Sequence, residues 1–364
     1  MERNRKISFI YFTDKGGELA LQYITCLTEL GFAVDAADGR GRMQEWTHEH
    51  FCASSVLVFI GAAGIAVRTI SPFIKDKFTD PAVIVIDEKG EFVIPILSGH
   101  VGGANQYARL LATLGGGTPV ITTATDVNGL FAVDVFAARN GLVIGDREAA
   151  KRFSASLLQN TNAVKAKLLI PESLKDDIVA DGNPPAEISL RVKRLFEQVS
   201  PAEQVSPTED CLSAGAACIT PFETTPYDTG ILRLIPKMAI LGVGCRKDKD
   251  PEELISFAGS LLKEHELDPR CLKAVATIDI KIDEPAVKKL AEHFGVPLLT
   301  FSAEELAAAE GEFHGSAFVE KTTGVDNVCE RAAAAAGACR ILVPKRACDG
   351  MTAAVGICKA RLRF

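Results

Sequence analysis

The feature that most constrains this fold is an uncharged run of β-forming residues, Val56–Ile60, followed by small residues and a helical stretch. Such a continuous apolar run is typical of a strand that is buried on both faces of a sheet. Strands alternate with helical stretches through the first part of the chain, which indicates an α/β domain with helices on both faces of its sheet. The predicted strands are 6–12, 32–36, 56–60, 82–87, 91–97 and 119–121, and the predicted helices are 18–30, 65–74 and 103–114.

The same alternation returns after residue 237, where strands are predicted at 238–243, 271–277, 297–301, 341–343 and 352–357. Three helices of this part carry start signals: Asp250 before Pro251, Ser302 before Glu305, and Asp326 ahead of an alanine-rich stretch. The segment between the two parts is rich in proline and acidic residues. The fold class predicted is α/β: two three-layer α/β domains with mostly parallel sheets, 1–145 and 236–364, joined by a smaller irregular middle region, 146–235.

Composition excludes several classes of protein. The chain has 40 Lys and Arg against 47 Asp and Glu, which argues against a nucleic-acid binder because such proteins carry a basic face. We expect no signal peptide, since the apolar run 7–12 is short, and no membrane span, since no uncharged run is long enough. The ten cysteines fit neither a zinc site nor a disulfide framework, so we expect reduced thiols in a cytoplasmic protein.

Ligands of α/β proteins bind beyond the carboxyl ends of strands, and four loops of this chain fit that position. The first holds Gly61, Gly64 and Arg68, where small residues allow a ligand to approach the backbone and the helix start favours an anion. The alternative is a plain strand-to-helix turn. Dinucleotide binding is not expected because the glycine fingerprint is absent.

The second loop runs from Ser98 to Asn105 and combines a hydroxyl, an imidazole, two adjacent glycines and an amide. If this segment is extended, Ser98 and His100 point the same way. His100 is a candidate general base near neutral pH, and the amides of Gly102 and Gly103 are candidates for holding an oxyanion. A purely structural histidine is the alternative, and a nucleophilic serine is less favoured because G-x-S-x-G is absent.

The third loop places Thr122, Thr123, Thr125 and Asp126 within five residues after a predicted strand. Asp126 is a candidate partner that orients His100 or holds a water molecule. The alternative is that Thr125 or Asp126 only caps the next helix.

The fourth loop, Gly244-Cys245-Arg246, opens the C-terminal domain. The planar guanidinium of Arg246 suits a ligand carboxylate, and Lys281 lies near another strand end. Cys245 lies near a helix start, which can lower a thiol pKa, but no partner base is evident for it. A solvated surface is the alternative for these cations.

Long stretches of the sequence resemble the cobalt-precorrin-5A hydrolases of anaerobic cobalamin biosynthesis. In the N-terminal part these are GAAGIAVRTISPFIKDKFTDPAVIVIDEKGEFVIPILSGHVGGANQYARLLA and PVITTATDVNGLFAVD. In the C-terminal part they are LGVGCRKDKDPEELI, ATIDIKIDEPAVKKLAEHFGVPLLTFSAEEL and ILVPKRACDGMTAAVGI. The middle region matches only as a variable connector.

This resemblance implies a cobalt-bearing tetrapyrrole substrate with a δ-lactone, which the enzyme opens with water before a two-carbon fragment leaves as acetaldehyde. It implies no cofactor of the protein's own, since cobalt arrives within the substrate. Its partners would be this substrate, possible neighbouring corrin-pathway methyltransferases and a possible second copy in a homodimer, with no nucleic acid and no membrane.

On this basis the hypothesis is that His100 with Asp126 activates or positions the water, that Gly102 and Gly103 stabilise the oxyanion, and that cations bind the substrate carboxylates. The cations in question are Arg68, Arg246 and Lys281. Two alternatives stay open: a tetrapyrrole-binding carrier that hands on pathway intermediates, and an unrelated nucleotide-binding α/β protein.

Overall fold

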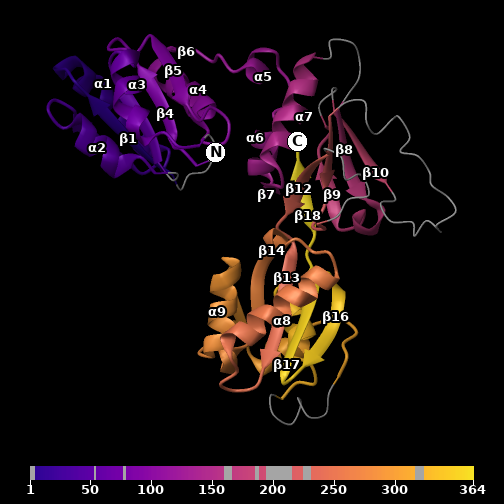
Figure 1. The fold of residues 1–364 in the computed structure, drawn as a ribbon. Helices are drawn as coiled ribbons and strands as arrows, with labels where there is room; N and C mark the ends of the chain where they lie inside the picture. The colour runs from indigo at the N-terminus through magenta and orange to yellow at the C-terminus, as the bar shows by residue number, and fades with distance from the viewer. Residues whose placement is uncertain are drawn as a thin grey trace. The chain divides into compact units, whose positions relative to one another are not determined.

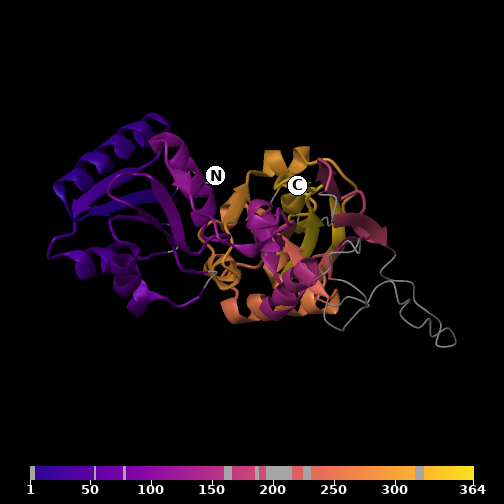
Figure 2. The same ribbon diagram turned by 90° about the horizontal axis from the view of Figure 1, so that it is seen from above.

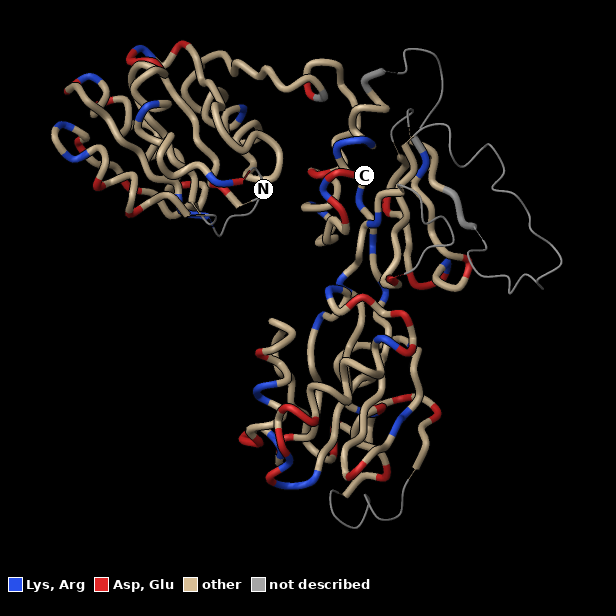
Figure 3. Tube along the Cα trace, in the orientation of Figure 1, with Lys and Arg blue, Asp and Glu red and all other residues tan. Residues whose placement is uncertain are grey.

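The computed structural model describes residues 5–52, 55–76, 79–159, 166–184, 188–193, 215–223, 231–315 and 324–364 (Figure 1). The chain divides into two compact units, Met1–Val135 and Phe136–Phe364, and each is considered by itself. Figure 3 shows acidic and basic residues interspersed along the described trace of both units. None of the described helices is long and apolar enough to span a membrane.

The first unit is built on a six-stranded sheet in the order β2-β1-β3-β4-β5-β6. Strands β1 to β4 are parallel to one another, β5 is antiparallel to β4, and β6 is parallel to β5. The elements of this unit are β1 (Lys6–Tyr11), α1 (Asp14–Glu29), β2 (Val34–Asp38), α2 (Met43–His50), β3 (Ser55–Ile60), α3 (Ala63–Ile70), β4 (Ala82–Ile86), β5 (Phe92–Leu97), α4 (Ala104–Gly115), β6 (Thr118–Pro119), α5 (Ala124–Val127) and the start of α6 (Val133–Arg139).

Helices cover both faces of this sheet, as the strand pattern predicts (Figures 1 and 2). On one face α1 and α4 bury residues such as Tyr23 and Leu111 against Phe9 and Val58. The other face packs against α2 and α3, in a core that includes Trp46. Because side chains alternate along a strand, the uncharged run of β3 contributes to both cores.

The direction of β5 decides where the candidate loops lie. Leu97, at the carboxyl end of β5, pairs with Val83 near the amino end of β4. The loop after β5 therefore lies at the edge of the sheet opposite to the loop after β3. Strand β6 runs parallel to β5 and delivers the segment 120–126 to the same edge as the β5 loop.

The described part of the second unit contains two five-stranded sheets and the two-stranded pair β18-β9, and the first five-stranded sheet lies in the middle region. Its order is β10-β8-β11-β12-β7, and only the β12–β7 pair is antiparallel. The described part of this region is thus more regular than the proline-rich sequence suggested. The elements are β7 (Leu142–Ile144), α7 (Arg147–Gln159), β8 (Ala166–Pro171), β9 (Ile178–Asp181), β10 (Ile188–Lys193), β11 (Ala216–Ile219) and β12 (Leu232–Pro236).

The second sheet of this unit has the order β15-β14-β13-β17-β16, parallel from β15 to β13 and antiparallel from β13 to β16. Helix α12 packs against one face through Ile240 and Ala274, and α8 packs against α9. The elements are β13 (Ala239–Cys245), α8 (Pro251–Glu264), β14 (Leu272–Ile278), η5 (Asp279–Lys281), α9 (Pro285–Phe294), β15 (Leu298–Phe301), α10 (Ala303–Ala308), α12 (Cys329–Ala335), β16 (Arg340–Cys348) and β17 (Met351–Ile357). The final strand, β18 (Ala360–Arg363), pairs with β9.

Two of the three predicted helix starts are confirmed. The Asp250 side chain accepts hydrogen bonds from the amides of Glu252 and Glu253, and Ser302 forms a capping box with Glu305. The prediction for Asp326 is wrong, because α12 starts later, at Cys329, and has no side-chain cap. The Asp326 carboxylate instead accepts a hydrogen bond, at 2.7 Å, from the side chain of Arg331 within α12. It therefore pairs with a side chain of the helix and not with the amides at the helix start.

Candidate active site

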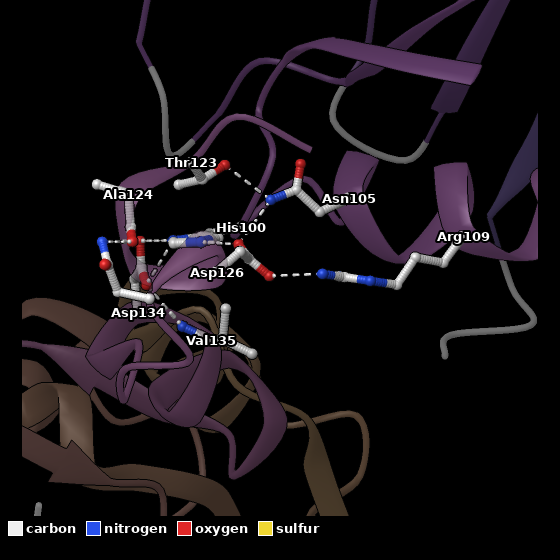
Figure 4. A network of polar contacts seen from close by, with 9 residues as sticks. His100, Asn105, Arg109, Thr123, Ala124, Asp126, Asp134 and Val135 are labelled. Atoms are coloured by element: carbon white, nitrogen blue, oxygen red, sulfur yellow. Dashed lines mark hydrogen bonds and ion pairs between the residues drawn. The ribbon is translucent and has the colours of Figure 1, made fainter. Parts of the chain in front are cut away.

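His100 is the centre of a polar network in the first unit (Figure 4). It lies in the loop between β5 and α4, where only 15% of its side chain is exposed. Nε2 of His100 is 2.7 Å from Oδ2 of Asp126, and Nδ1 is 3.2 Å from Oδ2 of Asp134. A single imidazole therefore joins two carboxylates from the segment that follows β6.

This arrangement favours the protonated form of His100. A neutral imidazole has one donor and one acceptor nitrogen, whereas an ionised carboxylate only accepts hydrogen bonds. The hydrogen bond with Asp134 raises the pKa of His100 most, burial opposes the rise, and the Asp126 carboxylate adds to it. Because both ring nitrogens face carboxylates, the geometry favours a positioning role for His100 over the general-base role predicted from the sequence.

Asp126 receives hydrogen bonds from three different side chains. Besides His100, Asn105 donates to Oδ2 at 2.8 Å and Arg109 donates to Oδ1 at 3.2 Å. Burial acts to raise the pKa of Asp126, but these donors outweigh it and hold the pKa below its ordinary value. Asp126 lies inside the short helix α5, so it does not serve merely as a cap of the following helix.

Asn105 connects this network to Thr123. The Asn105 side chain is almost fully buried, and its Nδ2 also donates to Oγ1 of Thr123 at 2.9 Å. A Cβ atom at Gly99 would lie 2.8 Å from Oδ1 of Asn105, so this approach requires glycine. Thr122 is exposed. The side chain of Thr125 lies outside the described part of the structure.

Ser98 and the neighbouring glycines do not have the geometry expected from the sequence. Ser98 has a φ of 52°, so the segment is not extended and Ser98 and His100 do not follow strand alternation. Oγ of Ser98 is buried and has no hydrogen-bond partner among the described residues. The amide of Gly103 donates to the carbonyl of His100 at 3.0 Å and is not free for an oxyanion. Gly102 packs tightly against Ser98 and the backbone of Ala82.

Gly61, Gly64 and Arg68 lie apart from the His100 network. The amide of Gly61 donates to the carbonyl of Ile86, at the carboxyl end of β4. Gly102, in contrast, lies beside Ala82 at the amino end of β4. The two predicted loops are therefore on opposite edges of the same sheet.

A cavity of about 900 Å³ lies in the second unit, at the carboxyl ends of β13 and β14 and beside the β16–β17 hairpin. Its volume is in the range typical of small-molecule sites. Four residues predicted to bind substrate line it together: Gly244, Cys245, Arg246 and Lys281. They converge because β13 and β14 are adjacent parallel strands whose carboxyl ends meet at one edge.

The lining of this cavity is mixed in polarity. Lys281 and Lys345 provide amines, while Ile278, Ile280 and Val328 provide apolar surface. The Arg246 side chain extends over Gly350 in the hairpin turn, where a Cβ atom would overlap it. Burial, as the largest influence, raises the pKa of the Cys245 thiol, which makes a thiolate nucleophile at neutral pH unfavourable.

Comparison with known proteins places both sites in one family. The family models "Cobalamin synthesis G N-terminal" and "Cobalamin synthesis G C-terminus" match residues 45–126 and 239–356. The cobalt-precorrin-5A hydrolase of Salmonella typhimurium is 36% identical over 293 residues, which cover 80% of this chain and 79% of that protein. This chain belongs to the cobalt-precorrin-5A hydrolase family. The hydrolase of Priestia megaterium is 34% identical over 278 residues, which cover 76% of this chain and 71% of that protein.

The first matched region contains His100 and Asp126, and the second contains all the residues that line the cavity. Asp134 lies after the first matched region, and sequence reasoning missed it together with Arg109. Arg109 carried a signal, because it follows Asn105 by four positions and so shares its helix face. Asp134 offered no local pattern that pointed to His100.

Proposed function

We propose that this chain hydrolyses cobalt-precorrin-5A: it opens the δ-lactone with water, and the two-carbon unit then leaves as acetaldehyde. The curated hydrolases of Salmonella typhimurium and Priestia megaterium, similar over most of their length, support this activity. The overall reaction breaks a carbon–carbon bond as well as the lactone, so the chain would be formally a C–C hydrolase.

The observation that carries this proposal is the convergence of cations and apolar side chains in the C-terminal cavity. A tetrapyrrole presents apolar ring faces and a rim of carboxylates. Ile280 lines the cavity yet is 63% exposed, which suits contact with a ring face. Arg246, Lys281 and Lys345 suit the carboxylate rim. Because the chain as a whole is acidic, it needs such a local group of cations to bind a substrate with several carboxylates.

The His100 network has a positioning role in this account. Its two carboxylates come from the segment 124–135, and the imidazolium between them holds that segment against the loop after β5. His100 would act through this structure rather than as the base that activates water. Cobalt belongs to the substrate, and no step needs a metal held by the protein.

The test is acetaldehyde release from enzymatically prepared cobalt-precorrin-5A under anaerobic conditions. Release at a rate proportional to the protein concentration is expected, with a matching change in the absorbance spectrum of the corrinoid. Tight binding of the tetrapyrrole without acetaldehyde would favour a carrier instead. Neither binding nor release by folded protein would contradict the proposed substrate.

A further inference from the structure

We propose that Glu284 is the general base that activates water for lactone opening, an inference that rests on the proposed function. Glu284 immediately precedes α9, and its side chain lines the C-terminal cavity. Only 5% of the side chain is exposed. A carboxylate with so little exposure, lining a cavity of the size of a small-molecule site, is placed to act on a water molecule bound there.

The two oxygens of Glu284 have different environments. Oε2 accepts a hydrogen bond from Nζ of Lys281 at 3.0 Å. Oε1 is buried and receives no hydrogen bond from the residues that the structure describes. Buried carboxylate oxygens are normally hydrogen-bonded, so Oε1 is the oxygen that a water molecule or substrate group would satisfy.

Helix capping does not account for this side chain. Glu284 occupies the position where a capping residue would accept hydrogen bonds from the start of α9, yet its side chain makes no such bond. Pro285 follows and has no amide hydrogen to donate. The side chain is turned instead to Lys281 and the cavity.

The other acidic residues around the cavity are exposed. Asp248, Asp283 and Asp349 line the cavity but are open to solvent, and Asp349 is paired with Lys249. Cys245 lies close enough for its thiol to be influenced by both Lys281 and Glu284, but its pKa is raised by burial. Glu284 is thus the buried carboxylate among the described residues that line the cavity.

The step balances with water as the only co-reactant. The water oxygen forms a bond to the acyl carbon of the lactone while Glu284 accepts one of its protons. The acyl carbon–oxygen bond then breaks, its electron pair stays on the departing oxygen, and Glu284 returns the proton to that alkoxide. The products are a free carboxyl group and the alcohol from which acetaldehyde is lost. Lys281, paired with Glu284, keeps the carboxylate oriented throughout.

Glu284→Gln is the direct test, measured as the single-turnover rate with enzyme in excess, alongside the dissociation constant for the corrinoid. The change keeps the shape of the side chain and removes its basicity. The rate is expected to fall at least about a hundredfold, with the dissociation constant changed less than about threefold. Glu292→Gln removes a charge from the exposed side of the same helix and is expected to retain the wild-type rate.

Lys281→Met separates catalysis from positioning. If Glu284 only holds Lys281 in place, Glu284→Gln and Lys281→Met raise the dissociation constant equally and leave the single-turnover rate of bound substrate unchanged. That result would overturn the proposal. A Glu284→Gln variant that binds and turns over like the wild type would also overturn it. The wild-type protein is assayed in the same experiment. If the wild type itself releases no acetaldehyde, the proposed function fails, which is distinct from the failure of this inference.

Discussion

Nε2 of His100 lies 2.7 Å from Oδ2 of Asp126, although the two residues are separated by a helix and a strand. The contact exists because β6 runs parallel to β5, so the segment after β6 leads toward the edge of the sheet at which β5 ends. Asp134 approaches the other nitrogen of the ring. Removing any member of this network should therefore lower the free energy of unfolding of the first unit more than it changes the reaction proposed for the cavity of the second unit.

His100→Ala is expected to lower the free energy of unfolding of the first unit by about 3 kcal/mol. The substitution leaves Asp126 and Asp134 mostly buried without the cation between them. Urea unfolding followed by the fluorescence of Trp46, the single tryptophan and a core residue of this unit, measures the change. An unfolding midpoint equal to that of the wild type would show that His100 does not stabilise the unit through Asp126 and Asp134.

The stabilisation by His100 is expected to depend on pH in a defined direction. Because the pKa of His100 is raised on folding, its contribution is complete below about pH 6.5 and is lost as pH rises through the folded value. Because the pKa of Asp126 is lowered, its contribution is present above about pH 4 and is lost as pH falls through the folded value. The stability difference between wild type and His100→Ala should be largest between these limits. A stability difference between wild type and His100→Ala that grows as the pH rises above neutral would contradict this prediction.

Two glycine substitutions in the second unit are expected to have opposite effects. A Cβ atom at Gly242 in β13 would overlap the carbonyl oxygen of Cys329 in α12, so Gly242→Ala should destabilise by about 3 kcal/mol. A Cβ atom at Gly259 inside α8 meets nothing, so Gly259→Ala should stabilise by about 0.5–1 kcal/mol. Thermal unfolding by circular dichroism compares them. Equal effects would show that β13 and α12 do not approach so closely.

Arg246→Ala is expected to weaken binding of the corrinoid about tenfold, because one guanidinium–carboxylate contact is lost. The affinity of the wild type should also fall with added salt more steeply than that of the variant. Arg346→Ala is the matched control, since Arg346 pairs with the exposed Glu264 and does not line the cavity. Titrations followed by corrinoid absorbance measure both. Equal affinity of the two variants would remove Arg246 from the binding site.

Apolar periodicity was sufficient to predict helices such as α1, α4 and α8 and the strands of the first and last sheets. It did not predict α2, α5, α6, α7 or the strands of the middle region. The sequence also placed Gly244, Cys245, Arg246 and Lys281 after predicted strands, and the structure brings them together because β13 and β14 are adjacent and parallel. The short turn at 88–90 between β4 and β5 requires an antiparallel pair, since a parallel connection needs a long crossover.

Contacts between residues distant in sequence were the main limit. Asp134 ends the quoted stretch PVITTATDVNGLFAVD, but nothing local in it points to His100, and only the fold brings the two residues together. Glu284 was not singled out from the sequence, because its burial beside Lys281 depends on the packing of α9 and η5. Local patterns predict which elements form, whereas the protonation of a side chain depends on neighbours supplied by tertiary structure.

The most direct measurement is the fate of cobalt-precorrin-5A incubated with this protein in water labelled with heavy oxygen. We expect acetaldehyde to be released, and one labelled oxygen to appear in the new carboxyl group of the corrinoid product by mass spectrometry. Acetaldehyde with an unlabelled product would contradict lactone opening by water. Unchanged substrate in the presence of folded protein would contradict the hydrolase activity itself.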